Sequence, residues 1–508
     1  MKNKYIFRLL GVVGGLAGVF PSQAQLTLTG QLRTRTELRD GYGNLLPKDA
    51  SAAAFTSQRT RLSVGYKVDR LSFGFTAQDV RVWGQDASTI TAADGNRFSV
   101  HEAWAELQLL NKADTSIHLK WLDQLSLKVG RQELDYDGSR LLGNLDWLQQ
   151  ARRFDAALFK ARHRGWALDL GGGFNQNSDA FGLTGTAYTP GNVATTALST
   201  KNVILSIPAG FIPTSGKNGA PILANAVSTN GQNQQFKAFQ MAHLTKVIKG
   251  HTLTGLFFKD DFSKYRIDST GSISNGYVYG RRYDIRGVNS RVTYGAMLTG
   301  LLAKTTLGKF SYLAFAYAQS GHDRDGLTIN GAHYYGVNLA YLQNRFTVTA
   351  GYENLTGNKP DQPTGTTRRF DPLYGTPHKY WGTMDYFYVG TGSPVGGLQD
   401  AFLKVKYTVK RFTAGLDVHY FALESPIVNR LSEVPSTFRG HLGNEYDFVA
   451  SYALNKFTAL ELGYSLMQGT NQLEYAKQNT LNQKEKLGQW GYLMLNIRPD
   501  FLAKSAKP

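Results

Sequence analysis

Arginines recur at every second position in two stretches near the start of the chain. Arg33 and Arg35 lie in the run QLRTRTELR, and Arg59 and Arg61 lie in the run SQRTRLSVG. A guanidinium group binds a carboxylate or a phosphate through paired hydrogen bonds. Side chains two residues apart share one face of a β-strand. The spacing therefore predicts rows of cations that face an anionic solute.

The residues from 57 to 84 indicate which elements carry these cations. Two arms of roughly ten residues alternate between apolar and polar side chains, and Val68-Asp69-Arg70 forms a tight turn between them. Strands of a soluble sandwich are usually shorter. Strands of about this length span an outer membrane, with the apolar face toward lipid and the polar face toward a lumen. The apolar face consists of Leu62, Val64, Tyr66, Leu71, Phe73, Phe75 and Ala77.

The N-terminus predicts export from the cytoplasm. Lys2, Lys4 and Arg8 precede an apolar run, and Ser22-Gln23-Ala24 forms a small-x-small cleavage site, so we expect a signal peptide at 1–24. The chain has no cysteine, and no later stretch resembles a membrane helix. Removing the peptide lowers the formal charge from +18 to +15. Nucleic acid is an improbable partner for an exported chain, so the excess charge points to an anionic solute or to anionic lipid.

The rest of the chain predicts an all-β fold over residues 25–508, a single transmembrane antiparallel barrel. A short basic or Asn-containing turn recurs between strands, as in Gly308-Lys309-Phe310, Asn344-Arg345-Phe346 and Lys410-Arg411-Phe412. Eight such turns alternate with nine long connections, which implies about 18 strands with short periplasmic turns and long extracellular loops. We expect the long connections at 41–54, 85–97, 135–153, 177–234, 260–287, 319–332, 355–399, 423–444 and 468–488.

Charged side chains on these strands must point inward, because a Lys or Arg facing lipid at mid-membrane costs about 2–4 kcal/mol. Alternation assigns to the lumen Arg33, Arg35, Arg59, Arg61, Glu102, Glu106, Lys404, Lys406 and Asp417. Two positions fit less simply. Arg81 faces inward only if a β-bulge follows Gln78, and Arg131 shares its parity with the apolar Val129. A lumen rich in arginine and lysine favours anions over cations.

Several motifs resemble the alginate-export family of outer-membrane barrels. They are SQRTRL (57–62), QDVRVWG (78–84), HEAWAEL (101–107), LKVGRQEL (127–134), RLLGN (140–144) and WLQQARRFD (147–155). The block FDPLYGTPHKYWGTMDYFYVG (370–390) is similar to one found in bacteroidete members. The resemblance implies an 18-stranded barrel with an arginine-rich constriction that a polyuronate crosses. It points to Arg59, Arg61, Arg81, Arg131, Arg152 and Arg153, with Glu102, Glu133 and Asp155 as partners.

The sequence thus predicts a channel for an anionic solute, foremost a uronate-type polysaccharide or oligosaccharide. One alternative is a porin for small organic anions, with 177–234 or 355–399 as a constricting plug. Another is a barrel enzyme acting on lipid or glycan, although no nucleophile elbow, zinc motif or phosphate loop is present. We expect no cofactor and no metal. Direction of transport, oligomeric state, and gating by a loop or a periplasmic partner stay open.

Overall fold

A computed structural model describes residues 24–84, 98–112, 121–176, 188, 196–208, 210–217, 219, 222, 236–306, 308–387, 393–434 and 436–503. Apart from Ala24, the predicted signal peptide lies outside these residues, as do most of the predicted loops 85–97 and 177–234. No helix of the described chain is long and apolar enough to cross a membrane.

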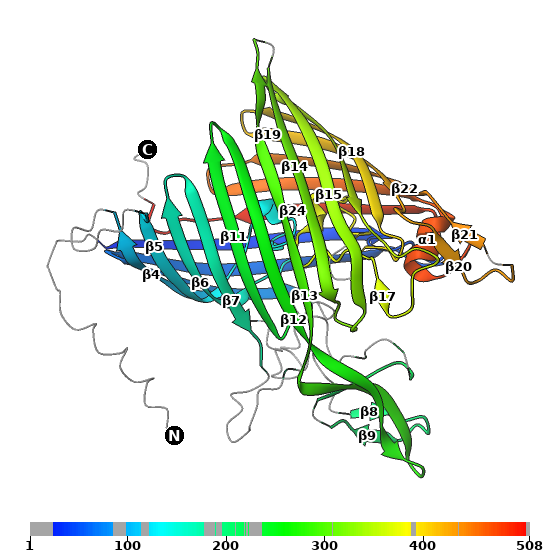
Figure 1. Cartoon of the computed structure of the whole chain (residues 1–508). Helices are drawn as coiled ribbons and strands as arrows, with labels where there is room; N and C mark the ends of the chain where they lie inside the picture. The colour runs from blue at the N-terminus through cyan, green and yellow to red at the C-terminus, as the bar shows by residue number, and fades with distance from the viewer. Residues whose placement is uncertain are drawn as a thin grey trace, which may run out of the picture.

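The described chain forms a closed antiparallel barrel of 18 strands, which confirms the predicted fold (Figure 1). Each strand pairs with its neighbour along the chain, and β1 pairs with β24 to close the wall. The strands are β1 (Gln25–Asp40), β2 (Ala53–Val68), β3 (Leu71–Val82), β4 (Phe98–Asn111), β5 (Gln124–Gln132), β6 (Phe154–His163), β7 (Trp166–Phe174), β11 (Ala238–Ile248), β12 (His251–Ser272), β13 (Gly276–Lys304), β14 (Lys309–His322), β15 (Thr328–Gln343), β16 (Phe346–Leu355), β18 (Leu398–Val409), β19 (Phe412–Ala422), β22 (His441–Ala453), β23 (Thr458–Gly469) and β24 (Leu487–Ile497).

Seven short turns and the connection between Asn111 and Gln124 lie at one end of the barrel, and the other connections lie at the opposite end. The turn after β2 begins at Asp69 with φ 47°, and the turns after β11, β15 and β18 begin with similar positive angles at Lys249, Asn344 and Lys410. Two-residue hairpin turns need this left-handed backbone, because it matches the twist of the flanking strands. The basic turns of the sequence are therefore hairpin turns, as predicted.

Alternate residues of each strand form the outer wall. Leu339, Leu416 and Leu462 are about half exposed, whereas their neighbours along the strands point into the lumen. An apolar outer face is what lipid requires, so the described barrel crosses the outer membrane.

Two predicted loops are wrong. The region 260–287 is mostly a hairpin, because β12 and β13 stay paired beyond the barrel, apart from an irregularity between Ser263 and Tyr265. The connection at 319–332 shrinks to 323–327. The extended hairpin is the green projection in Figure 1. It carries β10 (Phe211–Pro213) along β13, near the two-stranded β8 (Thr196–Leu198) and β9 (Ile204–Ser206).

Two other connections fold back into the barrel. We call residues 133–153 and 356–387 together the plug. The plug contains two short 3₁₀ turns, Asp137–Ser139 and Pro377–Lys379, and the bridging strand β17 (Thr366–Thr367). Its Leu142, Leu373, Tyr374 and Met384 have no exposed surface and belong to one core with inward-facing wall residues. At the loop end of the barrel lie helix α1 (Asn471–Gln478) and a pair of short strands, β20 (Ile427–Asn429) and β21 (Ser436–Phe438).

Candidate functional site

Three lumen arginines converge on one plug carboxylate, Asp146. Arg59 and Arg61 reach it at 2.9 and 3.2 Å, and Arg33 at 3.5 Å. The three arginines come from β1 and β2, where alternate inward positions place them side by side. Burial raises the pKa of Asp146, but the charges of the arginines outweigh burial and hold the pKa below its usual range. We call Arg33, Arg59 and Arg61 the arginine clamp.

The clamp also binds the plug backbone. Arg33 donates to the carbonyl oxygens of Asp146, Trp147 and Leu148 and to the amide oxygen of Gln149. Arg59 donates to the side-chain oxygen of Gln31 at 2.7 Å. Three guanidinium groups thus share the single carboxylate of Asp146. In the part of the chain that the structure describes, Nη2 of Arg61 is buried without a hydrogen-bond partner.

Arg35 lies beside the clamp, but its guanidinium contacts the aromatic ring of Trp147. Its guanidinium pairs with Glu37 at 2.8 Å and lies 4.1 Å from the ring centre of Trp147. Trp147 in turn stacks on His378 of the second plug segment, with centroids 4.3 Å apart. Arg33, Arg35, Arg59 and Arg61 thus face the lumen as predicted, where they hold the plug.

Charged pairs fix the plug to other parts of the wall. Arg140 of the plug binds Glu353 of β16 at 2.6 Å, and Arg291 of β13 binds Asp371 of the plug at 2.7 Å. Tyr374 donates to Asp260 of β12 at 3.0 Å. Together with the clamp, these contacts attach the plug to β1, β2, β12, β13 and β16, so it is held from several sides of the lumen at the loop end.

Further contacts join the plug's two segments and seat the second against the wall. Arg152, predicted from the resemblance, is buried and donates to the carbonyl oxygens of Tyr374 and Gly375. Gly382 has φ +77°, and a Cβ there would meet the Glu445 carboxylate of β22. Glycine is therefore required at this close approach. Arg152 joins two plug segments and does not line a path.

The predicted acids Glu102, Glu106 and Glu133 also face inward. Oε1 of Glu133 lies 2.8 Å from His101, its Oε2 accepts from Asn144, and its backbone N–H lies 3.4 Å from Glu102. Glu106 accepts from Ser126 at 2.6 Å and lies 3.7 Å from Lys160. Glu102 and Glu133 thus lie at the plug, and Glu106 lies nearer the turns.

Lys404, Lys406 and Asp417 occupy the half of the lumen near the tight turns. Lys404 pairs with Asp417 across β18 and β19 at 2.7 Å. Lys406 lies on the same inward-facing side of β18 as Lys404 and the buried Phe402. Its side chain is exposed. These side chains face open lumen.

Three predicted lumen residues lie on the outer wall. The β2–β3 register is unbroken from Ser57 to Val68, so no bulge turns Arg81 inward. Arg81 lies opposite Gln58, on the reverse side from Arg59, and pairs with Asp79 at 2.7 Å.

Arg131 and Asp155 form a similar outer pair at the loop-end rim. Buried Gln132 fixes the inward parity of β5, so Arg131 must point outward. Arg131 lies directly opposite Asp155 and binds it at 2.8 and 2.9 Å. Arg153 lies beside this pair, and burial together with the charge of Arg131 lowers its pKa. The resemblance had implied lumen positions for Arg81, Arg131, Arg153 and Asp155; strand parity excludes an inward position for Arg81, Arg131 and Asp155.

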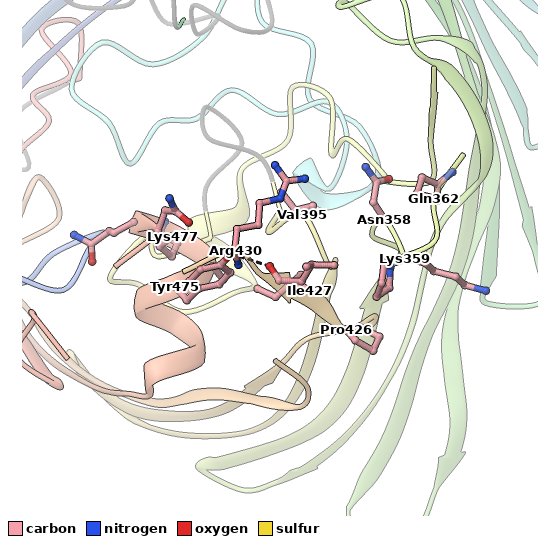
Figure 2. Close-up of a pocket in the computed structure, with 14 residues that line it drawn as sticks. Asn358, Lys359, Gln362, Val395, Pro426, Ile427, Arg430, Tyr475 and Lys477 are labelled. Atoms are coloured by element: carbon pink, nitrogen blue, oxygen red, sulfur yellow. Dashed lines mark hydrogen bonds between the residues drawn. The ribbon is translucent and has the colours of Figure 1, made fainter. Parts of the chain in front are cut away.

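A cavity of about 600 Å³ opens at the loop end (Figure 2). Helix α1 lines one side, and Asn358 and Gln362 line the other. Its charged lining residues in the described chain are Lys359, Arg430 and Lys477, with no Asp or Glu. The backbone N–H of Arg430 donates to the Tyr475 hydroxyl at 2.7 Å, which positions the arginine at the cavity. Burial lowers the pKa of Lys477 to about 8.

Comparisons with known proteins agree with this architecture. The family model described as alginate export matches residues 24–171, which confirms the resemblance over that part of the chain. No curated protein sequence matches the chain. Solved structures with a similar fold include OpdK of Pseudomonas aeruginosa with vanillate, at 10% identity and a TM-score of 0.51 over 94% of this chain and 99% of that one.

Two further structures are similar at the same level. OccD3 (OpdP) of Pseudomonas aeruginosa has 9% identity and a TM-score of 0.53, covering 94% of this chain and 92% of its own. OccAB2 of Acinetobacter baumannii has 12% identity and a TM-score of 0.52, covering 94% and 98%. The protein is an outer-membrane β-barrel with the architecture of channels.

Proposed function

We propose that this barrel, whose residues 24–171 match the alginate-export family, conducts small organic anions across the outer membrane. The observation that carries the proposal is the loop-end cavity of about 600 Å³, with three cations and no acid among its described lining residues. Cavities of this size suit a single small molecule. A cationic lining lowers the energy of an anion relative to a cation.

The plug supports a small solute over a polymer. Its charged contacts reach β1, β2, β12, β13 and β16, and its centre packs as a protein core. A hydrated polysaccharide needs a continuous wide lumen, which this packing opposes. OpdK, a barrel of similar fold, has been solved with vanillate, which is consistent with a small organic solute.

Between the plug and the tight turns, Lys404 and Lys406 extend the cationic surface; Asp417 pairs with Lys404, and Glu106 pairs with Lys160 on another part of the wall. Acids spaced among cations keep an anion from binding too tightly to leave. We assign these lumen residues to the solute path, and the arginine clamp to holding the plug and supplying a positive field.

Export of a polyuronate is the second candidate. The observation that favours it is the match over residues 24–171, which include the whole arginine clamp. This function requires the plug to leave the lumen, because the clamp is occupied by Asp146 while the plug is in place.

Planar-bilayer recording separates the two candidates. The mature protein is reconstituted, the reversal potential is measured in a salt gradient, and small carboxylates and long polyuronates are added in turn. We expect anion selectivity and current block by the small carboxylates. The variant Lys359→Gln with Arg430→Gln should weaken this block several-fold, whereas the control Lys201→Gln with Arg439→Gln should leave it unchanged. Cation selectivity, or block by long polyuronates alone, would refute the small-anion channel.

A further inference from the structure

The eight connections at the turn end, which are seven tight turns and the connection between Asn111 and Gln124, are rich in cations that lie outside the proposed solute path. Each of them has at least one described Lys or Arg within it or at the strand end next to it, whereas the only described acids in them are Asp69 and Asp123. We call these cations the basic ring, which consists of Arg70, Lys112, Arg164, Lys249, Lys304, Lys309, Arg345, Lys410, Arg411 and Lys456. Loops at the opposite end mix both signs, as in Lys48-Asp49 and Lys484-Glu485.

Barrel topology distributes these cations around the whole rim. Strands follow one another in chain order around the wall, so a turn occurs at every second strand junction. The remaining junction at this end joins the chain termini, and Arg498 follows β24 there. The positive charge therefore surrounds the barrel and is not confined to one sector.

Most cations of the basic ring keep their charge available to an outside partner. Lys112 has an ion pair, with Asp123 at 3.6 Å. The Lys456 ammonium lies 4.6 Å from the ring centre of Phe457. In the described chain, no ion pair is recorded for four exposed members, Lys249, Lys309, Arg345 and Lys410. The lumen cations differ, because most of them are paired with acids.

Outward-facing aromatic residues fix the level of the ring in the membrane. Exposed aromatic residues lie on the outer wall at the first or second position of the strand after a basic turn: Trp166, Phe310, Phe346 and Phe412. Phe310 packs on Tyr341, and Phe346 packs on Tyr407, both with centroids 4.8 Å apart. Such aromatic girdles lie at the boundary between acyl chains and headgroups. The cations lie one or two residues farther out, which is the level of the lipid phosphates.

We propose that the basic ring binds anionic phospholipid headgroups of the membrane leaflet at the tight-turn end. Long Lys and Arg side chains reach from the aromatic girdle to phosphate oxygens. A soluble protein partner would need only one sector of the rim. A solute in the lumen would be guided by cations along the lumen wall, whereas the cations of the basic ring lie at the rim, next to the lipid-facing aromatic residues. The continuous ring fits the lipid that surrounds the barrel on all sides.

Lipid selectivity measured by electron paramagnetic resonance tests the proposal. The mature chain is placed in phosphatidylcholine nanodiscs that contain spin-labelled phosphatidylglycerol or spin-labelled phosphatidylcholine. Each nearby cation is expected to favour the anionic lipid about fivefold in association constant at low salt. The ring variant is Lys249→Gln, Lys309→Gln, Arg345→Gln, Lys410→Gln and Lys456→Gln. The matched control at the other end is Lys48→Gln, Lys201→Gln, Lys217→Gln, Arg266→Gln and Arg439→Gln.

We expect the wild type and the control variant to prefer phosphatidylglycerol, and the ring variant to lose most of that preference. High salt should weaken the preference of the wild type, since surface charges are screened. If the ring variant with its five substitutions does not fold, the single variant Lys456→Gln, which removes one exposed turn charge, provides a second measurement. An undiminished preference in the ring variant, or an equal loss in the control, would overturn the proposal. The proposal would also be overturned if the wild type showed no lipid preference and the ring variant changed the current block by a soluble carboxylate. That result would assign the basic ring to solute capture.

Discussion

The two halves of the lumen follow the same strand alternation but differ in what faces their inward charges. At the loop end, Arg59, Arg291 and Glu353 are buried, and each binds a plug residue of opposite charge. At the turn end, Lys406 is exposed to open lumen. The comparison shows that an inward charge on a barrel strand has no fixed role. Its partner decides whether it holds structure or acts on a solute.

Removing the second plug segment should have the largest effect. Replacing residues 369–387 by a short Gly-Ser linker should raise single-channel conductance about fivefold or more, because an 18-stranded barrel without a plug leaves a wide aqueous channel. Shortening the hairpin at 264–284, which extends beyond the barrel, should leave conductance as it is. Unchanged conductance after the plug deletion would show that the constriction lies elsewhere.

The next effect compares one residue from each half. Arg59→Ala should lower the free energy of unfolding by about 3 kcal/mol, because it breaks a buried ion pair and removes hydrogen bonds to Gln31. Lys406→Ala should cost less than about 0.5 kcal/mol, as exposed substitutions usually do. Chemical unfolding in detergent micelles measures both. Equal costs would contradict the division between the halves.

Charge changes in the turn-end half should alter selectivity with the fold intact. Lys404→Gln with Lys406→Gln should lower the anion-over-cation permeability ratio about twofold, since Asp417 is then left without its cation. Asp417→Asn is the matched control and should move the ratio in the opposite direction. Reversal potentials in a salt gradient measure these ratios, and a double variant with the wild-type ratio would exclude these lysines from the path.

The smallest expected effect is a pH dependence at Lys477. Burial lowers the pKa of Lys477 from 10.5 to about 8, with the charge of Arg369 acting in the same direction against that of Asp385. The lysine is cationic below that value and neutral above it, so anion block at the loop-end cavity should weaken as pH rises from 7 to 9. Between pH 8 and 10.5 the folded chain binds fewer protons than the unfolded chain, so folding stability should rise with pH there.

Lys477→Met separates these contributions. In this variant the change in block between pH 7 and 9 should disappear, while block at pH 9 stays near the wild-type value. A variant that keeps the full pH step would assign the titration to another group.

Local patterning was enough to predict the barrel. Alternation, basic hairpin turns and the even strand number follow from short-range rules, and Leu339 and Leu462 face outward as expected. The hairpin beyond the membrane was missed because polar strands there alternate without a lipid face. Arg81 and Arg131 were misplaced because a charge was assumed to outweigh strand parity, whereas a neighbouring acid satisfies each one on the outer wall.

The plug was harder to predict, because its contacts join residues far apart in the chain. Asp146, Arg140 and Arg291 take part in its attachment, and no local spacing relates them to Arg59 or Glu353. One signal was present. The block 370–390 is rich in aromatic residues, and loops on a solvated surface have little reason to be. Such a composition indicates burial, although it does not say against which wall.

The seam between β1 and β24 has a consequence for how the protein is made. The indole of Trp490 donates to Glu37 across it, between residues 453 positions apart. Until the last strand is synthesised, both edges of the sheet stay open and prone to wrong pairing. Contacts this distant in sequence also form slowly. The plug contacts the first two strands and the middle of the wall, and none of these contacts needs the last strand. The seam is therefore the part of the wall that waits for the complete chain.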